Sequence, residues 1–144
     1  MMTRGFLLGA VWLLLSGCGG RSATNREPAL DDRDRVEVLY FHGKQRCATC
    51  TAIEKNARET VETLFADEAE SGVVVFRSVD ISAPENERLA EAYQVVWSSL
   101  FVNRWRDGRE TRENLTGFAF GNARTAPDAF RDGLAEKIAD ALNE

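Results

Sequence analysis

The segment that decides the fold runs from Arg35 to Cys50 and reads RVEVLYFHGKQRCATC. In its first eight residues, polar and apolar side chains alternate at first and the run then becomes almost wholly apolar, which is typical of a strand buried on both faces. A short polar loop follows, and after it come Cys47 and Cys50. This order predicts a buried strand that leads, through a loop, into a helix with a Cys-x-x-Cys pair at its N-terminus.

The residues after the cysteine pair predict a helix and a second strand. Apolar residues recur at spacings of three and four over residues 53–65, as on one face of a helix, and Gly72 is expected to end that helix. Residues 73–81 predict a second buried strand, so that two parallel strands and a long helix form a right-handed βαβ unit. The Ser-x-x-Glu spacing of residues 82–85 has the form of a capping box and predicts a short helix to Tyr93.

The last third of the chain predicts a hairpin and a final helix. Residues 100–102 begin a third strand, Asp107-Gly108 is the dipeptide of a tight turn, and residues 110–115 form a weaker fourth strand. A final helix is expected to begin near residues 125–128. Its apolar face carries side chains four positions apart, namely Phe130, Leu134, Ile138 and Leu142. The sequence therefore predicts an α/β fold in the order βαβ, helix, ββα.

Size, charge and metal-binding residues narrow the possible functions. The chain has 144 residues, which suits one domain with a modest core. Its net charge of −5 provides no field that would gather phosphates, so nucleic acid is not expected as a partner. One His, three Cys and two Met barely supply the ligands of a zinc, copper or iron–sulfur site. We therefore expect no metal and no bound cofactor.

A separate pattern occupies the N-terminus. Arg4 precedes an apolar run, Gly5–Leu15, which is shorter than the roughly 20 residues of a transmembrane helix but has the length of the apolar part of an export signal. The run ends in Leu-Ser-Gly-Cys at residues 15–18, which resembles the bacterial lipobox. In that motif the cysteine is lipidated and becomes the first residue of the mature protein.

The lipobox resemblance implies three parts. Residues 1–17 are expected to be a lipoprotein signal peptide, residues 18–34 a lipidated Cys18 with a flexible tether, and residues 35–144 the folded domain. Lipid on Cys18 would hold this domain at a bacterial membrane, in the cell envelope and facing the periplasm or the exterior. A plain secretory signal and an uncleaved N-terminal anchor are the alternatives, and both place the domain outside the cytoplasm.

The cysteine pair carries the expected chemistry. Unpaired backbone N–H groups and the positive end of the helix dipole favour a thiolate on Cys47, and Lys44 and Arg46 add positive charge nearby. Cys50, one turn into the helix, is more shielded. A structural disulfide or half of a zinc site has the same spacing. However, His42 alone cannot complete a zinc site. A structural disulfide would close a loop too small to restrain the unfolded chain much. Redox use of the pair is therefore favoured.

These features together resemble the thioredoxin superfamily over residues 35–142. The segment Tyr40–Cys50 is also similar to small exported thioredoxin-like proteins found with arsenic-resistance or nitro-compound reduction genes. The resemblance implies a three-layer fold with a central four-stranded mixed sheet. It also implies that Cys47 is the attacking thiol and Cys50 the resolving thiol of a disulfide exchange.

The sequence departs from the superfamily pattern in two places. Thioredoxins usually have a buried Asp in the strand before the motif, whereas the matching stretch here, Tyr40-Phe41-His42, has no carboxylate. They also have a cis-proline that faces the disulfide, and the matching position here is Ser98-Ser99. A cis bond before a non-proline residue costs about 2.5–4 kcal/mol, so we expect a trans or reshaped loop and regard Ser99 as a modulator of the site.

Other side chains have two possible roles each. His42 is either a base that assists proton transfer or a structural residue. Trp97 and Trp105 each line a substrate groove or pack in the core, and packing is the favoured role of Trp105. Phe118 and Phe120 are expected to cover the sheet.

The expected function is a membrane-tethered, extracytoplasmic thiol–disulfide oxidoreductase that forms a mixed disulfide with its substrate. Its partners would be a protein or small-molecule thiol or disulfide and a redox protein that resets the pair, and the chain is expected to be a monomer. The alternative is a non-enzymatic lipoprotein of the same fold that binds a partner, with Cys47 and Cys50 in a permanent disulfide.

Overall fold

The computed structural model describes residues 33–144. The expected signal peptide, Cys18 and most of the expected tether lie outside these residues. Within the described part of the chain, no helix is both long enough and apolar enough to cross a membrane. The elements, in chain order, are β1 (Arg35–His42), α1 (Ala48–Leu64), α2 (Ala66–Ser71), β2 (Val74–Asp80), the 3-10 turn η1 (Pro84–Asn86), α3 (Glu87–Tyr93), β3 (Ser99–Arg106), β4 (Arg109–Asn114), α4 (Thr116–Asn122) and α5 (Pro127–Asn143).

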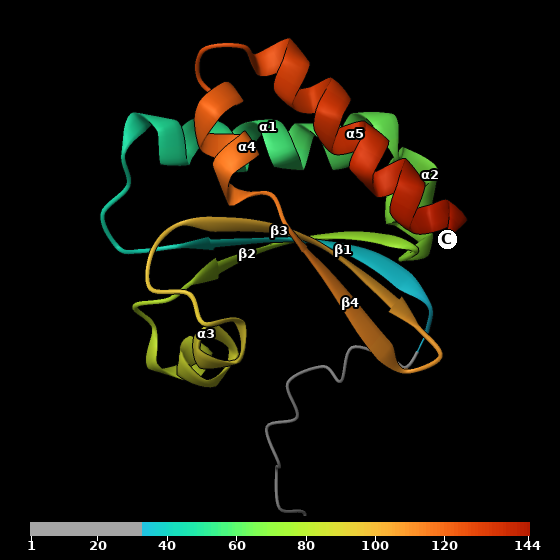
Figure 1. Ribbon diagram of the computed structural model, residues 1–144, viewed down its shortest axis with the longest axis horizontal. Helices are drawn as coiled ribbons and strands as arrows, with labels where there is room; N and C mark the ends of the chain where they lie inside the picture. The colour runs from blue at the N-terminus through green and yellow to red at the C-terminus, as the bar shows by residue number, and fades with distance from the viewer. Residues whose placement is uncertain (1–32) are drawn as a thin grey trace, which may run out of the picture.

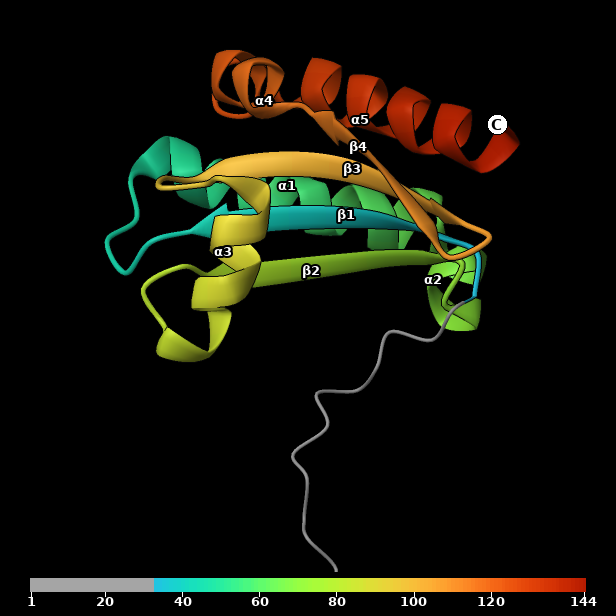
Figure 2. The same ribbon diagram turned by 60° about the horizontal axis from the view of Figure 1, so that its bottom comes forward.

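The described residues form a four-stranded mixed sheet in the order β2-β1-β3-β4. Strand β1 pairs in parallel with β2 and antiparallel with β3, and β4 runs antiparallel to β3. Helices α1, α4 and α5 cover one face of this sheet, and α3 lies against the other face (Figure 1 and Figure 2). The predicted α/β fold with three layers and a mixed sheet is confirmed.

Strand β1 lies between β2 and β3, and side chains on both of its faces are buried. Val38 and Tyr40 point into the larger core cluster, under α1 and α5, whereas Leu39 and Phe41 point into a smaller cluster under α3. All four have an exposed fraction of 0%. Alternate residues therefore enter different layers, which explains why this strand is apolar on both faces and why its end is a rigid support for the loop before Cys47.

The predicted helix after the cysteine pair is in fact two helices. The backbone of Phe65 leaves helical geometry, with φ −129° and ψ 37°, between α1 and α2. Its side chain packs against the larger core cluster. Gly72 then ends α2 in the left-handed conformation, with φ 77°, as predicted. The break at Phe65 lets its aromatic ring reach the core. A regular helix to Gly72 would have no such break.

The predicted capping box is wrong. The N–H and hydroxyl of Ser82 both donate to the Asp80 carboxylate, at 2.9 and 2.6 Å, and Ser82 does not cap a helix. The chain continues with the 3-10 turn η1, and the residue that precedes it, Ala83, makes no side-chain cap. Asp80, at the end of β2, thus accepts both hydrogen bonds of Ser82. Such local bonds of short polar residues often compete with helix capping.

The C-terminal half agrees with its predicted hairpin and final helix. Asp107 and Gly108 both have positive φ, 51° and 69°, as a two-residue turn of type I′ requires. In α5, three of the predicted apolar side chains have an exposed fraction of 0%, namely Phe130, Leu134 and Ile138. The fourth, Leu142, is half-buried and packs against the same cluster.

Helix α4 was not expected from the sequence. Its residues, TGFAFGN, include two glycines, which are poor helix formers. Phe118 stacks on Phe130, with ring centroids 5.6 Å apart, and so covers the core as expected. Phe120 is instead 43% exposed. Tertiary packing of Phe118 and Ala119 therefore supports a helix that local propensity alone does not favour.

Candidate active site

The two cysteines of the motif form a disulfide at the N-terminus of α1, with their Cα atoms 5.0 Å apart. Cys47 is the N-cap residue and has extended backbone geometry, so it lies just outside the helix. Cys47 is exposed, whereas Cys50, in the first turn, is only 7% exposed. The expected difference between an accessible and a shielded sulfur is present in the structure.

One backbone N–H of α1 is directed at the Cys47 sulfur. The N–H of Cys50 donates to Cys47 Sγ at 3.0 Å, and this N–H is one of those that a helix N-terminus otherwise leaves unpaired. The same contact, together with the helix dipole, favours negative charge on Cys47 when the disulfide opens. The geometry therefore supports a thiolate at Cys47 rather than at Cys50.

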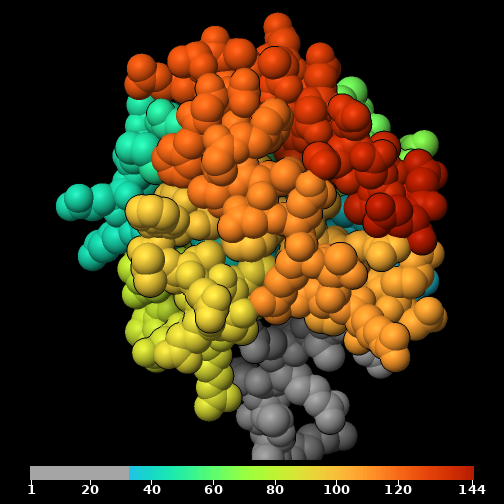
Figure 3. Space-filling model, in the orientation of Figure 1, coloured from blue at the N-terminus to red at the C-terminus, as the bar shows by residue number. Residues whose placement is uncertain are grey.

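The two basic residues of the loop before the motif, Lys44 and Arg46, have different surroundings. The segment 43–47, coloured teal, projects from one end of the molecule (Figure 1 and Figure 3). Lys44 is exposed. The Arg46 guanidinium forms an ion pair with the carboxylate of Glu54 on α1. Glu54 was not singled out from the sequence, although its position four residues after Cys50 places both on one face of α1.

His42 ends β1 on the same side of the sheet as Tyr40. Its ring centroid lies 6.0 Å from that of Tyr40, and its Nδ1 lies 3.1 Å from the carbonyl oxygen of Gly43. The side chain is half-buried. A local structural role explains these contacts without proton transfer.

Tyr40 is the side chain that β1 brings to the cysteine pair. Its hydroxyl donates to the carbonyl oxygen of Cys50 at 2.9 Å, and its exposed fraction is 0%. Burial raises the pKa of Tyr40, against the opposing effects of the Ser98 hydroxyl and of the Arg46 charge. The phenol therefore remains a protonated donor that holds the first turn of α1, in a strand where thioredoxins usually have an Asp.

The two tyrosines of the chain predict an alkaline transition. Burial raises the pKa of Tyr40 and of Tyr93 above the ordinary value of 10.0, and a hydrogen bond to the Glu110 carboxylate adds to the rise at Tyr93. Each phenol holds its proton more tightly in the folded state than in the unfolded state. Their contribution to stability is therefore complete below pH 10 and is lost as the pH rises above it.

We expect the ultraviolet absorbance of tyrosinate to appear above pH 10 and together with loss of the folded circular dichroism signal. A protein that stays folded and shows full tyrosinate absorbance with a midpoint near the ordinary pKa of 10.0 would contradict this prediction.

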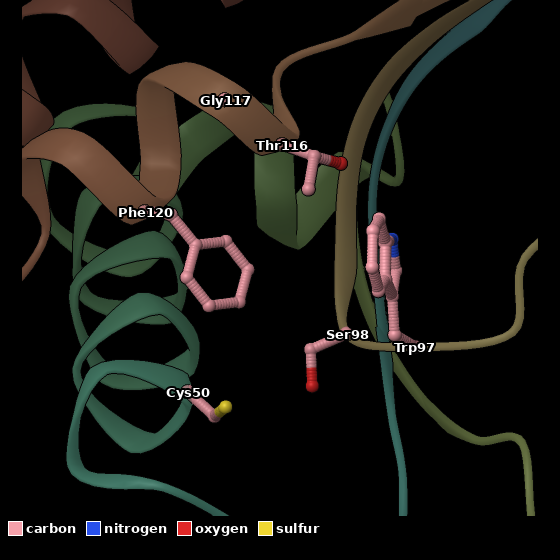
Figure 4. Close-up of a pocket in the computed structure, with 6 residues that line it drawn as sticks. All are labelled: Cys50, Trp97, Ser98, Thr116, Gly117 and Phe120. Carbon is pink, nitrogen blue, oxygen red and sulfur yellow. The ribbon is translucent and has the colours of Figure 1, made fainter.

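A cavity of about 420 Å³ opens beside the disulfide. The residues that line it are Cys50, Trp97, Ser98, Thr116, Gly117 and Phe120. Figure 4 shows Cys50 from α1, Phe120 from α4 and Ser98 from the segment before β3 around one shared space. Among the described residues, none that lines the cavity is charged. Trp97, at 71% exposed, and Phe120 make its accessible apolar surface.

The serine pair divides between this cavity and the sheet. Ser98 lines the cavity. Ser99 is 3% exposed, pairs with Phe41 in the sheet, and its hydroxyl donates to the carbonyl oxygen of Trp97 at 3.2 Å. The peptide bonds here are trans. Ser98 is therefore the serine beside the disulfide, and Ser99 supports the backbone next to Trp97.

Trp105 lies at the other end of β3 and takes no part in this site. The Arg35 guanidinium lies 4.8 Å from its ring centroid, and its indole N–H donates to the Glu37 carboxylate at 3.4 Å.

Between residues 33 and 144, no cluster of three or more His, Cys, Asp or Glu side chains is placed to hold a metal ion.

Comparisons with known proteins give structural matches at low sequence identity. No protein-family model matches the chain, and no curated protein matches its sequence. It is similar in structure to a thioredoxin from Thermus thermophilus, with 20% identity and a TM-score of 0.48 over 74% of this chain and 76% of that chain. It is also similar to a malarial protein, with 19% identity and a TM-score of 0.43 over 72% of this chain and 97% of that chain. The strand order and strand directions of this chain are those of a thioredoxin-like fold.

Proposed function

We propose that this chain is a thiol–disulfide oxidoreductase whose redox centre is the Cys47–Cys50 pair. The observation that carries the proposal is the asymmetry of the two sulfurs. Cys47 is exposed at the N-terminus of α1 and accepts a backbone N–H, whereas Cys50 is shielded and already within bonding distance. An accessible, stabilised thiolate beside a protected partner is the arrangement that disulfide exchange requires.

The reaction proceeds in two exchanges. The Cys47 thiolate attacks one sulfur of a substrate disulfide, a mixed disulfide forms, and the other substrate sulfur leaves as a thiolate that takes a proton from solvent. Cys50 then loses its proton to solvent and attacks Cys47 Sγ, so the mixed disulfide breaks and the second substrate thiol leaves. In this direction two electrons pass from the pair to the substrate, and an external dithiol returns the pair to its reduced state. The opposite direction, oxidation of a substrate dithiol by the Cys47–Cys50 disulfide, uses the same two cysteines, and the reduction potential and the partner that resets the pair set the direction.

The cavity beside Cys50 supports a substrate with an apolar group next to its reacting sulfur. Trp97 and Phe120 present apolar surface there, and no described residue that lines the cavity offers a charge to the carboxylates of a peptide such as glutathione. Burial of an apolar side chain against such a surface contributes about 25 cal/mol for each Å² removed from water. We therefore propose protein disulfides with apolar neighbours as the substrate class.

The test of the redox function is an equilibrium titration of the purified chain against glutathione buffers. An exchanging pair should change between dithiol and disulfide at a midpoint above about −300 mV. The free thiols are counted by alkylation and mass spectrometry at each buffer composition. A pair that stays oxidised at all potentials above this value is a structural bond, and the chain then belongs to the class of partner-binding proteins.

We further propose that Cys18 carries lipid and tethers the chain to a bacterial envelope membrane. Support comes from the sequence alone, in the Leu-Ser-Gly-Cys motif after a short apolar run. The variant Cys18→Ala should leave the membrane fraction or retain its uncleaved signal. Wild-type processing and membrane association of that variant would refute the assignment.

A further inference from the structure

Glu54 links the loop before the motif to the middle of α1. Its carboxylate forms one ion pair with Arg46 and a second with Arg58, whose guanidinium nitrogen lies 3.3 Å away. The side chain of Glu54 is 17% exposed and that of Arg46 is 31% exposed. The Arg58 guanidinium also lies over the Phe76 ring, 4.8 Å from its centroid. Glu54 is thus held between two cations on the face of α1 that also carries Cys50.

This ion pair changes the charge that the Cys47 sulfur experiences. Arg46 directly precedes Cys47, so a free guanidinium there could turn toward the sulfur and stabilise its thiolate. In the structure the guanidinium is bound to Glu54 instead. This pairing makes a thiolate at Cys47 less favourable than a free Arg46 guanidinium would.

The carboxylate remains charged at neutral pH. Burial raises the pKa of Glu54, but the Ser78 hydroxyl, the hydrogen bond from Arg46 and the charge of Arg46 together outweigh it, and the pKa falls below the ordinary value. The other titratable groups that act on this pair are His42 and Tyr40, at the end of β1, and Asp80, at the end of β2.

We propose that Glu54 sets the reduction potential of the Cys47–Cys50 pair by holding the Arg46 guanidinium away from the Cys47 sulfur. Less stabilisation of the Cys47 thiolate disfavours the reduced state and so lowers the potential. The pair becomes a stronger reductant than its position at a helix N-terminus alone would make it. This inference rests on the proposed redox function. It makes Glu54 a positioning residue that acts through Arg46.

The effect is measured by the exchange equilibrium between the cysteine pair and glutathione. The reduced pair and one glutathione disulfide give the Cys47–Cys50 disulfide and two glutathione thiols, with two electrons passing from the pair to glutathione. A group that stabilises the Cys47 thiolate holds the pair reduced and lowers the equilibrium constant of this oxidation.

The deciding variant is Glu54→Gln, which removes the charge and keeps the size of the side chain. We expect the equilibrium constant for oxidation of the pair to fall by about three- to tenfold, and tenfold corresponds to about 30 mV. The pH profile of Cys47 alkylation should move to lower pH in the reduced variant. The matched control is Glu59→Gln on the same helix, because Glu59 pairs with Lys55 and Arg131 and not with Arg46. That control should leave both measurements near wild type.

A double variant tests the route through Arg46. With Arg46→Gln already present, adding Glu54→Gln should change the equilibrium constant by less than about twofold, because no guanidinium remains to be released. A Glu54→Gln effect of undiminished size without Arg46 would overturn the positioning role, and so would an unchanged equilibrium and pH profile in the single variant. If the wild-type pair fails to exchange with glutathione, the proposed function falls as well. Normal exchange with no Glu54 effect refutes this inference alone.

Discussion

The Cys47→Ser variant is expected to reduce disulfides no faster than the assay without protein. Cys47 is the exposed sulfur of the pair, whereas Cys50 is 7% exposed and is one of the residues that line the cavity. A serine hydroxyl is not ionised at neutral pH and cannot replace the thiolate. The measurement is the rate of reduction of an oxidised peptide that carries an apolar residue beside each cysteine, with a dithiol as the external reductant.

The matched variant Cys50→Ser should behave differently. With the external dithiol left out, its Cys47 thiolate can still attack, so one peptide sulfur becomes a free thiol and a covalent adduct remains, visible by mass spectrometry. Without Cys50 the second exchange cannot follow. Wild-type turnover by Cys47→Ser, or an adduct that forms on Cys50 in that variant, would reverse the roles assigned to the two sulfurs.

The Phe130→Ala variant should show the largest loss of stability, about 3–5 kcal/mol. Phe130 has an exposed fraction of 0%, belongs to the larger core cluster and stacks on Phe118. Removing its ring leaves a cavity between α5 and α4 that the sheet cannot close. Urea denaturation followed by circular dichroism measures the loss, and the dependence on urea concentration should keep its wild-type slope.

Phe120→Ala is the control for this prediction. Phe120 sits on α4 two residues from Phe118, but it is 43% exposed and lines the cavity beside the disulfide. Its replacement should change the free energy of unfolding by no more than about 0.5 kcal/mol, while the rate with the apolar-flanked peptide falls. Equal destabilisation by the two variants would mean that α4 buries both rings alike, contrary to the structure.

Several parts of the fold could be predicted because local pattern and tertiary environment agree. The residues of β1 are apolar on both faces, as a central strand requires, and both faces are in fact covered. Asp107-Gly108 accepts the positive φ values of a tight hairpin. In α5, side chains four residues apart fall on the buried face. In each case one local rule was sufficient.

Other parts could not be predicted because a competing local contact or a group distant in the sequence decides them. Ser82 has the spacing of a helix cap, but the carboxylate of Asp80 at the end of β2 takes both its hydrogen bonds. Helix α4 contains two glycines and is supported by contacts with the core and α5. The loop charge of Arg46 was expected beside Cys47, and only the folded chain shows it paired with Glu54.

By itself, the sequence determined that a buried strand delivers Cys47 and Cys50 to the start of a helix, because hydrophobic periodicity and motif spacing are local properties of the chain. The tertiary structure decided what surrounds the two sulfurs. It brought Tyr40 to the Cys50 carbonyl oxygen, placed Phe120 over the cavity and paired Arg46 with Glu54. These contacts depend on how β1, α1 and α4 pack together, and no spacing along the chain specifies that packing.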